Sequence, residues 1–339
     1  YKGLEPSEEW QTNIMMARML MSDNLSICSP ATLGLQLLWA EYEDLLLVDI
    51  PSKYEVLTTE EFVERQNNRM EQVQNFLLQD WKESAVSIIS EETKQMDKDQ
   101  ALKFFEAVST LMSNQVRQLI TDSFEAYLEF FRQFAIEEPP TPQTMMEDIP
   151  QLWPNAFLKV KMTSVDNKVI FSDDTKTVRK ELIRVVKSLA EKSEKIPRPD
   201  SGVEGEQDPY LWSVPRDDEI IENAVSEIKP IVKKNLEVAG KSLEFYDKYL
   251  HVLSDKASIE VFVTQNHTRE EYVELIEKYI SIEAEIRKEC PIKIRLNMVE
   301  VDCSEINKLL RKECDEIVFL LINSILKSNF ERGKAVYQK

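Results

Sequence analysis

Hydrophobic residues recur every three or four positions along much of this chain, and the most regular stretch is residues 104–134. This spacing is the period of one face of an α-helix, and here it persists for about eight turns. A helix with so wide an apolar stripe must bury it against other helices. The stripe consists of Phe104, Val108, Leu111, Met112, Val116, Leu119, Ile120, Phe124, Tyr127, Leu128 and Phe131. Polar residues on or near the other side are Ser113, Asn114, Gln115, Thr121, Asp122 and Glu125.

A second long helix is predicted to begin at Thr59. Thr58 and Glu61 have the spacing of a capping box, in which each side chain bonds the backbone N–H of the other residue. The polar run 90–99 separates this helix from the one that covers 101–134, so the two are expected to form an antiparallel pair. The predicted buried residues of the upstream helix are Phe62, Met70, Val73, Phe76, Leu77, Trp81 and Val86.

Shorter helical patterns flank this pair. Ser29 and Pro30 open an apolar piece near the start of the chain, and residues 172–174 are expected to cap a helix further on. The first has apolar residues at Leu33, Leu37, Trp39 and Tyr42. The second has Val178, Leu182, Val185, Val186 and Leu189 inside.

The last third of the chain is predicted to be mostly helical. A helical run begins at residues 217–219, is kinked at Pro230 and reaches about residue 253, and a short helix at 256–262 follows. Thr268 and Glu271 form another capping box. The helix that it opens has its stripe at Val273, Ile276, Tyr279, Ile280 and Ala284. A final helix from Ser304 has Ile306, Leu309, Leu310, Ile317, Leu320, Leu321, Ile325 and Phe330.

Two stretches change from the helical period to strict alternation, which indicates extended chain. In the first, Asp166 and Asn167 form a turn between alternating segments and predict a β-hairpin at about 157–171. In the second, apolar and polar residues alternate at about 292–301. The fold class is therefore predicted to be mainly α: an elongated bundle of long antiparallel helices with one small β-hairpin and one short extended segment.

Proline clusters supply the predicted boundaries. Pro139, Pro140 and Pro142 cannot continue a helix, because proline lacks the N–H donor and clashes with the preceding turn. A second loop covers 197–215. The predicted division is an N-terminal helical piece (1–50), a long helical hairpin (51–136), a region of loop, β-hairpin, helix and loop (137–215), and a helical bundle (216–339).

Composition narrows the classes of protein. The 339 residues carry a net charge of −19, which disfavours nucleic acid or an anionic membrane as a main partner. Four widely spaced cysteines do not form a disulfide framework and favour a reducing compartment. The longest apolar runs are too short to span a bilayer. Because the chain starts at Tyr1 rather than Met, we expect it to be a piece of a longer protein.

Candidate chemical motifs all have simpler structural explanations. Residues 239–242 (Ala-Gly-Lys-Ser) resemble part of a phosphate loop, but Asn235 stands where the motif needs its first glycine. Cys290, Cys303, Cys314 and His267 could be counted as zinc ligands, yet none has the two-to-four-residue spacing of structural zinc sites.

The remaining titratable groups are explained in the same way. His251 and His267 are the only histidines, which leaves few candidates for base-assisted catalysis. The acidic pairs 60–61, 173–174 and 217–218 begin helices, where they complement the positive helix end. Residues 166–168 lack the glycine and the later glutamate of a calcium loop. We therefore predict no catalytic, cofactor-binding or metal-binding residues.

Two groups of residues could serve as interaction surfaces. The most basic stretch lies between residues 176 and 198 and consists of Lys176, Arg179, Lys180, Arg184, Lys187, Lys192, Lys195 and Arg198. A solvated helix face is the default interpretation, and a docking patch for an acidic partner is the alternative. The second group is Met15, Met16, Met19 and Met21, which either fill core space or line a flexible partner groove.

Several stretches together resemble the tail, or stem, of an axonemal dynein heavy chain. The most specific are residues 246–249, 267–272, 294–298 and 301–303, supported by 62–66, 104–123 and 169–172. The resemblance covers residues 54–336 in one collinear order. At Asn297 the family has glycine, and Asn tolerates the same left-handed backbone region.

The resemblance implies a non-catalytic segment just before the linker of the motor, with an inner-arm, single-headed type favoured. In this family ATP and Mg²⁺ bind in a ring of ATPase modules far downstream, so no cofactor is expected here. The implied partners are dynein light and intermediate chains, other axonemal proteins and, through adaptors, the doublet microtubule. The implied location is the axoneme of a cilium or flagellum. The alternatives are a stand-alone cytosolic helical adaptor and an enzyme with an unfamiliar site.

Overall fold

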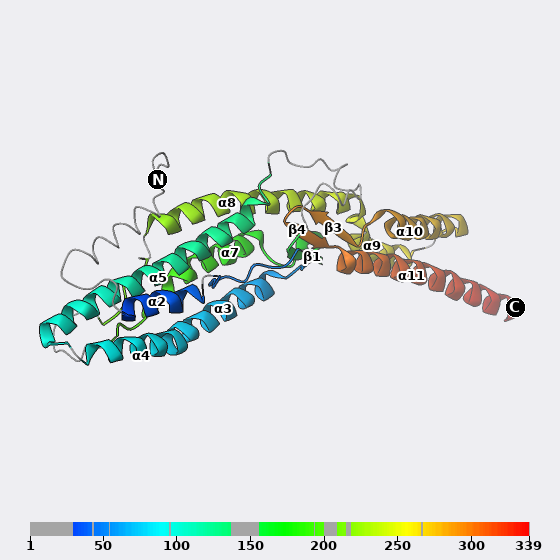
Figure 1. Ribbon diagram of the computed structural model, residues 1–339. Coiled ribbons are helices and arrows are strands. Elements are labelled where there is room, and N and C mark those ends of the chain that lie inside the picture. Colours follow the sequence, from blue (N-terminus) through cyan, green and yellow to red (C-terminus); the bar gives the residue numbers. More distant parts are fainter. Residues whose placement is uncertain are drawn as a thin grey trace. The chain divides into compact units, whose positions relative to one another are not determined.

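The computed structural model describes residues 30–42, 44–53, 55–94, 96–136, 156–192, 194–199, 209–214, 218–265 and 267–338. The fold is mainly α, as predicted (Figure 1). The four N-terminal methionines and the proline cluster at 139–142 lie outside the described residues. The helices are α2 (Pro30–Ala40), α3 (Thr59–Phe76), α4 (Lys82–Thr93), α5 (Lys98–Arg132), α7 (Thr175–Glu191), α8 (Glu219–Gly240), α9 (His251–Phe262), α10 (Arg269–Glu289) and α11 (Ser304–Tyr337).

Contacts group the chain into two compact units. Unit 1 comprises residues 1–50, 63–131 and 182–228, and unit 2 comprises 51–62, 132–181 and 229–339. Helices α3, α7 and α8 each have residues in both units. The sequence analysis divided the chain into four consecutive segments, whereas each of these units combines segments that are far apart in the sequence. The four-part division stays a prediction.

The core of unit 1 is built on α5. All eleven apolar residues of the predicted stripe are buried, and Val108, Met112, Val116 and Ile120 have no exposed surface. The prediction was wrong for Ser113 and Gln115, which are buried as well. The Ser113 hydroxyl accepts a hydrogen bond from the Trp212 backbone N–H at 3.0 Å, and the Gln115 amide donates to the Leu35 carbonyl at 3.4 Å. A second layer of chain therefore covers this side of α5.

The predicted long helix before α5 is interrupted by one π-helical turn, η1 (Leu77–Trp81), between α3 and α4. Burial follows steps of four residues from Leu77 through Trp81 to Ala85 and Ile89. Val86, which was predicted to be inside, is 37 % exposed because it falls off this row.

Helix α2 packs against α4 through its small residues. A Cβ atom at Gly34 would lie 3.2 Å from Cγ2 of Ile88, so the two helices approach closely at this point. The Glu92 carboxylate of α4 accepts a hydrogen bond from the Ala31 backbone N–H at 2.8 Å. Leu33 and Leu37, predicted as part of an inward stripe, are 56 % and 61 % exposed instead.

A polar clamp holds the segment after α2 to α3. Gln66 is fully buried; its amide donates to the Asp49 carbonyl at 2.7 Å and accepts from the Asp49 N–H at 3.0 Å. Arg65 adds a bidentate ion pair with the Asp49 carboxylate at 2.6 and 2.9 Å. The clamp satisfies the backbone of a segment that has no regular secondary structure of its own.

Unit 2 is organised around a four-stranded sheet in the order β2-β1-β4-β3. The strands are β1 (Leu158–Val165), β2 (Lys168–Phe171), β3 (Lys293–Leu296) and β4 (Val299–Asp302). The predicted hairpin is confirmed: β1 and β2 are antiparallel, and Asp166 and Asn167 have φ of 52° and 60°, as a tight hairpin turn requires. The expected extended segment is a second hairpin, β3–β4, and β1 and β4 pair in parallel to join the two hairpins.

The turn of the second hairpin is anchored by buried amides. Asn297 has φ of 50°, which confirms the left-handed backbone expected there. Its amide donates to the Phe134 carbonyl at 2.8 Å and to the Asn235 amide oxygen at 3.0 Å. Asn235 in turn donates to the same Phe134 carbonyl at 2.9 Å. Two side-chain amides therefore connect the sheet, α8 and the segment that follows α5 within unit 2.

The helical run after residue 218 differs from the prediction. Pro230 lies inside α8, and the α-helix ends at Gly240 rather than near residue 253. A 3₁₀ segment, η2 (Lys241–Tyr249), follows, and α9 begins at His251 rather than at residue 256. Tyr246 and Tyr249 of η2 are buried, so this tighter turn directs both rings into the core.

Helices α10 and α11 lie side by side in Figure 1, with α9 beside α11. The Thr268–Glu271 capping box is confirmed at the start of α10. The inward residues of α10 are Tyr272, Tyr279 and Ile286, whereas Val273 and Ile280 are 39 % and 53 % exposed, contrary to the prediction. None of the described helices combines the length and the hydrophobicity that a membrane span needs.

Candidate interaction surfaces

The motif at residues 239–242 has no phosphate-binding geometry. Gly240 has φ of −58° and ψ of −32°, which is helical backbone, and it lies at the junction of α8 and η2. The Ser242 hydroxyl is buried and donates to the Ala239 carbonyl at 2.6 Å. A phosphate loop needs several N–H groups that point into one open concavity, and helical backbone uses these groups internally.

The three described cysteines are buried thiols. Burial raises the pKa of Cys290 and Cys303 to about 11 and that of Cys314 to about 12. Because the thiolate is both the nucleophile and the metal ligand, these pKa values disfavour both roles near neutral pH. Within the part of the chain that the structure describes, no three His, Cys, Asp or Glu side chains form a group that could hold a metal ion.

His267 is part of an aromatic cluster at the start of α10. Its ring stacks on Phe262 with ring centroids 3.6 Å apart, and its Nδ1 lies 3.4 Å from the Glu271 carboxylate. Glu271 also accepts a hydrogen bond from the Thr268 backbone N–H at 2.7 Å. His267 therefore packs beside the capping box that starts α10.

The acidic residues at helix starts act as caps where the structure describes them. The Glu61 carboxylate accepts from the Thr58 backbone N–H at 2.8 Å, and Asp218 accepts from the Ile220 N–H at 3.0 Å. The hydrogen bonds from Thr58 lower the pKa of Glu61. A general acid needs the opposite shift, so the shift of Glu61 fits its role as a cap.

The sequence reasoning missed a buried carboxylate, Glu300 on β4, which is 1 % exposed. Its oxygens lie 3.0 Å from Lys293 Nζ and 2.9 Å from Arg295 Nε, both on β3. Burial alone would raise the pKa of Glu300, but the two cations lower it overall. The group therefore stays ionised and fixes the strand pair, and the cross-strand position of opposite charges could have revealed it.

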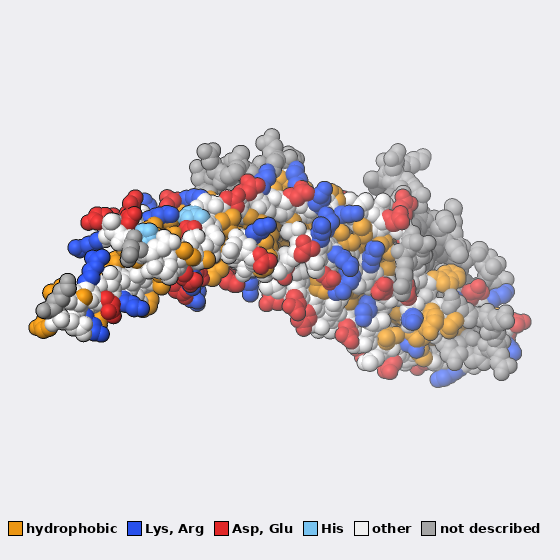
Figure 2. Space-filling model, turned by 180° about the vertical axis from the view of Figure 1, so that it is seen from behind, with side chains coloured by type: hydrophobic (Ala, Val, Ile, Leu, Met, Phe, Trp, Pro, Cys, Tyr) orange, Lys and Arg blue, Asp and Glu red, His pale blue; other side chains and the backbone are white. Residues whose placement is uncertain are grey.

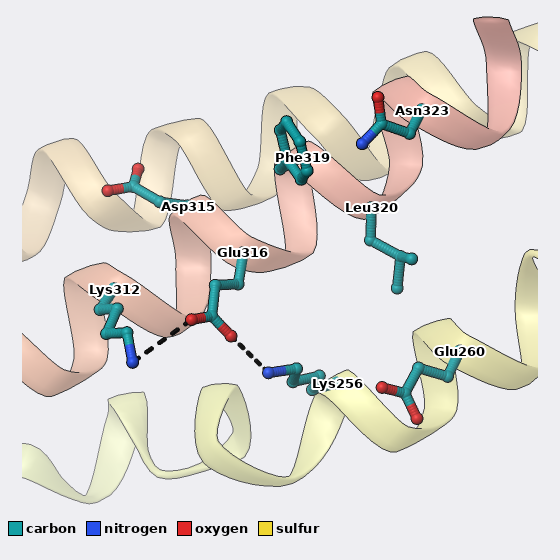
Figure 3. Close-up of a pocket in the computed structure, with 8 residues that line it drawn as sticks. All are labelled: Lys256, Glu260, Lys312, Asp315, Glu316, Phe319, Leu320 and Asn323. Carbon is teal, nitrogen blue, oxygen red and sulfur yellow. Dashed lines mark hydrogen bonds and ion pairs between the residues drawn. The ribbon is translucent and has the colours of Figure 1, made fainter.

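An open groove of about 590 Å³ lies between α9 and α11 (Figure 3). Glu316 on its floor pairs with Lys312 at 3.4 Å and with Lys256 across the groove. The carboxylate raises the pKa of Lys256, and the lysines lower that of Glu316. Glu316 and the two lysines are thus engaged with one another, and the lining also carries the carboxylates of Glu260 and Asp315.

The edge of this groove is apolar. Phe319 is 68 % exposed, and Leu326 and Phe330, seven and eleven residues later, are 60 % and 70 % exposed. These positions lie on one side of α11, opposite the buried row that the helix presents to α9 and α10. That buried row consists of Ile306, Leu310, Cys314, Ile317 and Leu321. Phe330, which the sequence analysis counted with the apolar residues of this helix, is therefore not part of the buried row.

Helix α7 carries the first five of the eight residues in the basic stretch found in the sequence, and the other three follow the helix. Figure 2 shows Lys and Arg side chains gathered in the region of α7 on this face of the molecule. Lys176, Lys180, Arg184 and Lys187 are all exposed. Their spacing of four, four and three residues places them on one face of the helix. The apolar residues predicted for this helix, from Val178 to Leu189, are buried on the other side.

The geometry defines a mainly α protein whose described surface carries an open groove beside α11 and exposed apolar side chains on the same helix. Comparison with known proteins identifies the class more closely: the chain is similar along almost its whole length to dynein heavy chains. No model of a known protein family matches it.

Three of the similar proteins carry the same name. The chain is 26 % identical to human dynein axonemal heavy chain 12 over 336 residues, which is 95 % of this chain and 10 % of that protein. It is 22 % identical to the rat and mouse proteins of the same name over 348 residues, or 99 % of this chain. The chain thus spans about a tenth of the length of these relatives, and the resemblance to axonemal dynein heavy chains is confirmed.

Several of the residues that carried the resemblance lie in the core of unit 2, whereas residues 63–66 and 104–123 belong to unit 1. Tyr246 is fully buried, and its hydroxyl donates to the Asn307 side chain at 2.7 Å. Cys303 is fully buried and begins α11 as its N-cap residue. Asn297 holds the hairpin turn described above. In this chain these positions serve core packing and a hairpin turn.

Proposed function

We propose that this chain is a non-catalytic segment from the tail of an axonemal dynein heavy chain. Its similarity to one such heavy chain over 95 % of its length carries this proposal. The segment serves as a helical scaffold that helps to anchor an ATP-driven motor to its own doublet microtubule and binds accessory chains. It works in the axoneme of cilia or flagella, and the ATPase sites belong to other parts of the parent protein.

The physical character of the chain supports a scaffold. Helices of 35 and 34 residues, α5 and α11, extend for about 50 Å each at 1.5 Å per residue. Helix α5 is held by one continuous buried stripe, and close packing of this kind resists deformation. Exposed apolar residues on α11 and the basic face of α7 provide surface for partners.

Two measurements test the proposal. Calorimetric titration of the 339-residue chain with Mg-ATP should give no binding heat, whereas saturable binding would favour an enzyme with its own site. Sequencing the transcript beyond the codon for Lys339 should reveal ATPase modules in the same reading frame. A stop codon soon after that position, with no such modules, would favour the stand-alone adaptor.

A further inference from the structure

Exposed apolar side chains of the described chain concentrate on α11, within unit 2. Among the described residues, five of the seven large apolar side chains that are at least 60 % exposed lie on this helix: Phe319, Leu326, Phe330, Val336 and Tyr337. From Leu326 to its end every residue of α11 is exposed, and in Figure 1 this end extends past α10. A lone helix of about three turns is marginal in water, so a packing partner would stabilise it.

The exposed side of α11 has the seven-residue repeat of a seam between paired helices. Two series of residues, each spaced by seven, form this seam: Phe319, Leu326 and Gly333, and, four residues after each, Asn323, Phe330 and Tyr337. These are the d and a positions of a heptad, which one helix presents to another over about 27 Å here. The buried row of α11 lies on the opposite side, and Figure 3 shows Phe319 directed away from α9.

Two residues of the seam, Gly333 and Asn323, favour a specific helix as its partner. Glycine inside a helix is less stable than alanine, and no contact in the described chain requires it, since a Cβ at Gly333 would have nothing within 4 Å. In a heptad seam this glycine leaves a space that a large side chain of a partner helix fills. Asn323 stands at an a position, where a single polar residue fixes the register of a helix pair.

The charges that flank the seam are positive. Lys327 and Lys334 occupy the e position of the heptad, where side chains pair across a helix interface, and both are exposed. The g position on the other flank carries no charge and holds Ile322, Asn329 and Val336. A partner helix therefore matches this seam when Asp or Glu faces the two lysines.

We propose that this seam of α11 docks an amphipathic helix of a partner protein. The partner helix has a large apolar residue opposite Gly333 and acidic residues opposite Lys327 and Lys334. A second copy of this chain fits less well: a parallel pair places glycine against glycine and leaves a void, and an antiparallel pair places lysine against lysine. The inference deepens the proposed function, because the expectation that a partner protein is present rests on it.

The probe is a fluorescent helical peptide of three heptads with Leu at its a and d positions and Glu at its e and g positions. Its anisotropy is measured against the 339-residue chain. The seam variant combines Leu326→Gln and Phe330→Gln. The matched control combines Leu33→Gln and Leu37→Gln, two exposed leucines of α2 that are also four residues apart.

A second variant tests the charges. It combines Lys327→Glu and Lys334→Glu, and it is measured against the Glu peptide and against a peptide with Lys in place of each Glu. The unmodified chain should prefer the Glu peptide and this variant the Lys peptide, because like charges across a helix interface disfavour pairing.

The seam variant should bind the Glu peptide about tenfold more weakly than the unmodified chain, and the α2 control should bind within about twofold of it. Without peptide, circular dichroism should give the same helix content for all the proteins, since the substituted residues are exposed. Undetectable binding of the Glu peptide, an equal loss in the α2 control or an unchanged preference after charge reversal would overturn the inference.

Other occupants of the seam give their own results, and each would overturn the inference. A second copy gives a dimer in sedimentation that the seam variant does not form. A membrane gives binding to phosphatidylserine vesicles that the seam variant loses. Another part of the parent protein gives crosslinks from Lys327 and Lys334 only to their own polypeptide in isolated axonemes. None of these outcomes alters the expectations for Mg-ATP and the downstream reading frame, which test the proposed function separately.

Discussion

Replacing Asn297 tests whether the buried amide pair holds the second hairpin in unit 2. Asn297 is 4 % exposed, has φ of 50°, and uses its amide group for the bonds to Phe134 and Asn235 described above. Asn297→Ala removes two buried hydrogen bonds and leaves a side chain with a Cβ in the left-handed region. Asn297→Gly removes the same bonds but adopts this backbone without strain.

The two variants separate two free-energy terms. Each buried hydrogen bond contributes about 0.5–1.5 kcal/mol net, so the glycine variant should lose about 1–3 kcal/mol of unfolding free energy. The alanine variant should lose about 1 kcal/mol more, because the left-handed conformation costs an L-residue about 1–2 kcal/mol. Asn297→Ala should therefore be the less stable of the two.

Asn167 supplies the matched control. It has φ of 60° in the first hairpin and is exposed, so Asn167→Ala carries the backbone cost without buried hydrogen bonds. Asn167→Gly should leave the stability within about 0.5 kcal/mol of the unmodified chain. Urea unfolding followed by circular dichroism gives the free energies, and hydrogen exchange of amides 294–301 gives a local measurement that does not depend on two-state unfolding.

The reasoning would be refuted by Asn297→Gly with the stability and exchange rates of the unmodified chain. In that case the hydrogen bonds of the Asn297 side-chain amide would contribute nothing to the unfolding free energy. Equal stability of the alanine and glycine variants at position 297 would instead show that the left-handed backbone costs alanine no free energy there.

Three further predictions concern other contacts. Gln66→Leu should lower the unfolding free energy by about 2–3 kcal/mol in urea melts, because it leaves the Asp49 N–H and C=O unpaired, whereas Gln72→Leu at an exposed position should change it by less than about 0.5 kcal/mol. Gly34→Leu should cost about 1–3 kcal/mol by forcing α2 from α4, and Gly240→Ala, with open space around it, should be neutral or stabilising by up to about 1 kcal/mol in the same assay. Burial alone would raise the pKa of Asp302, but its hydrogen bonds and an ion pair lower it from 3.8 to about 2. The contribution of Asp302 to the unfolding free energy is thus complete above pH 3.8 and is lost as the pH falls towards 2. The Asp302→Asn variant should therefore lack this loss of stability when its unfolding is measured as a function of pH in acid. An acid stability profile equal to that of the unmodified chain would contradict the assignment.

Local patterns in the sequence predicted the elements well, and long-range contacts explain the misses. The stripe of α5, the capping box at Thr268 and the turn at Asp166 all depend on residues within a few positions of one another. The parallel pairing of Leu158 with Val299 joins strands more than a hundred residues apart, and no local pattern encodes it. The second hairpin was predicted only as one extended segment, because apolar and polar residues keep alternating from Ile292 through the turn to Met298.

Burial was misjudged where a helix has apolar residues on two sides. In α11, Phe319 and Phe330 continue the helical period but lie opposite the residues that pack on α9 and α10. Periodicity alone cannot say which of two stripes faces the core. Of the interaction surfaces, the basic row of α7 was visible in the sequence, whereas the α9–α11 groove required the structure, since it combines residues from two helices.

Crosslinking mass spectrometry of isolated axonemes tests the central claim most directly, because it reports where this chain resides and what it contacts. The proposed scaffold role predicts that lysines of this segment crosslink to other axonemal proteins and that its peptides remain with the doublets after soluble proteins are washed away. Peptides of this segment found only in the soluble fraction, without crosslinks to axonemal proteins, would contradict it.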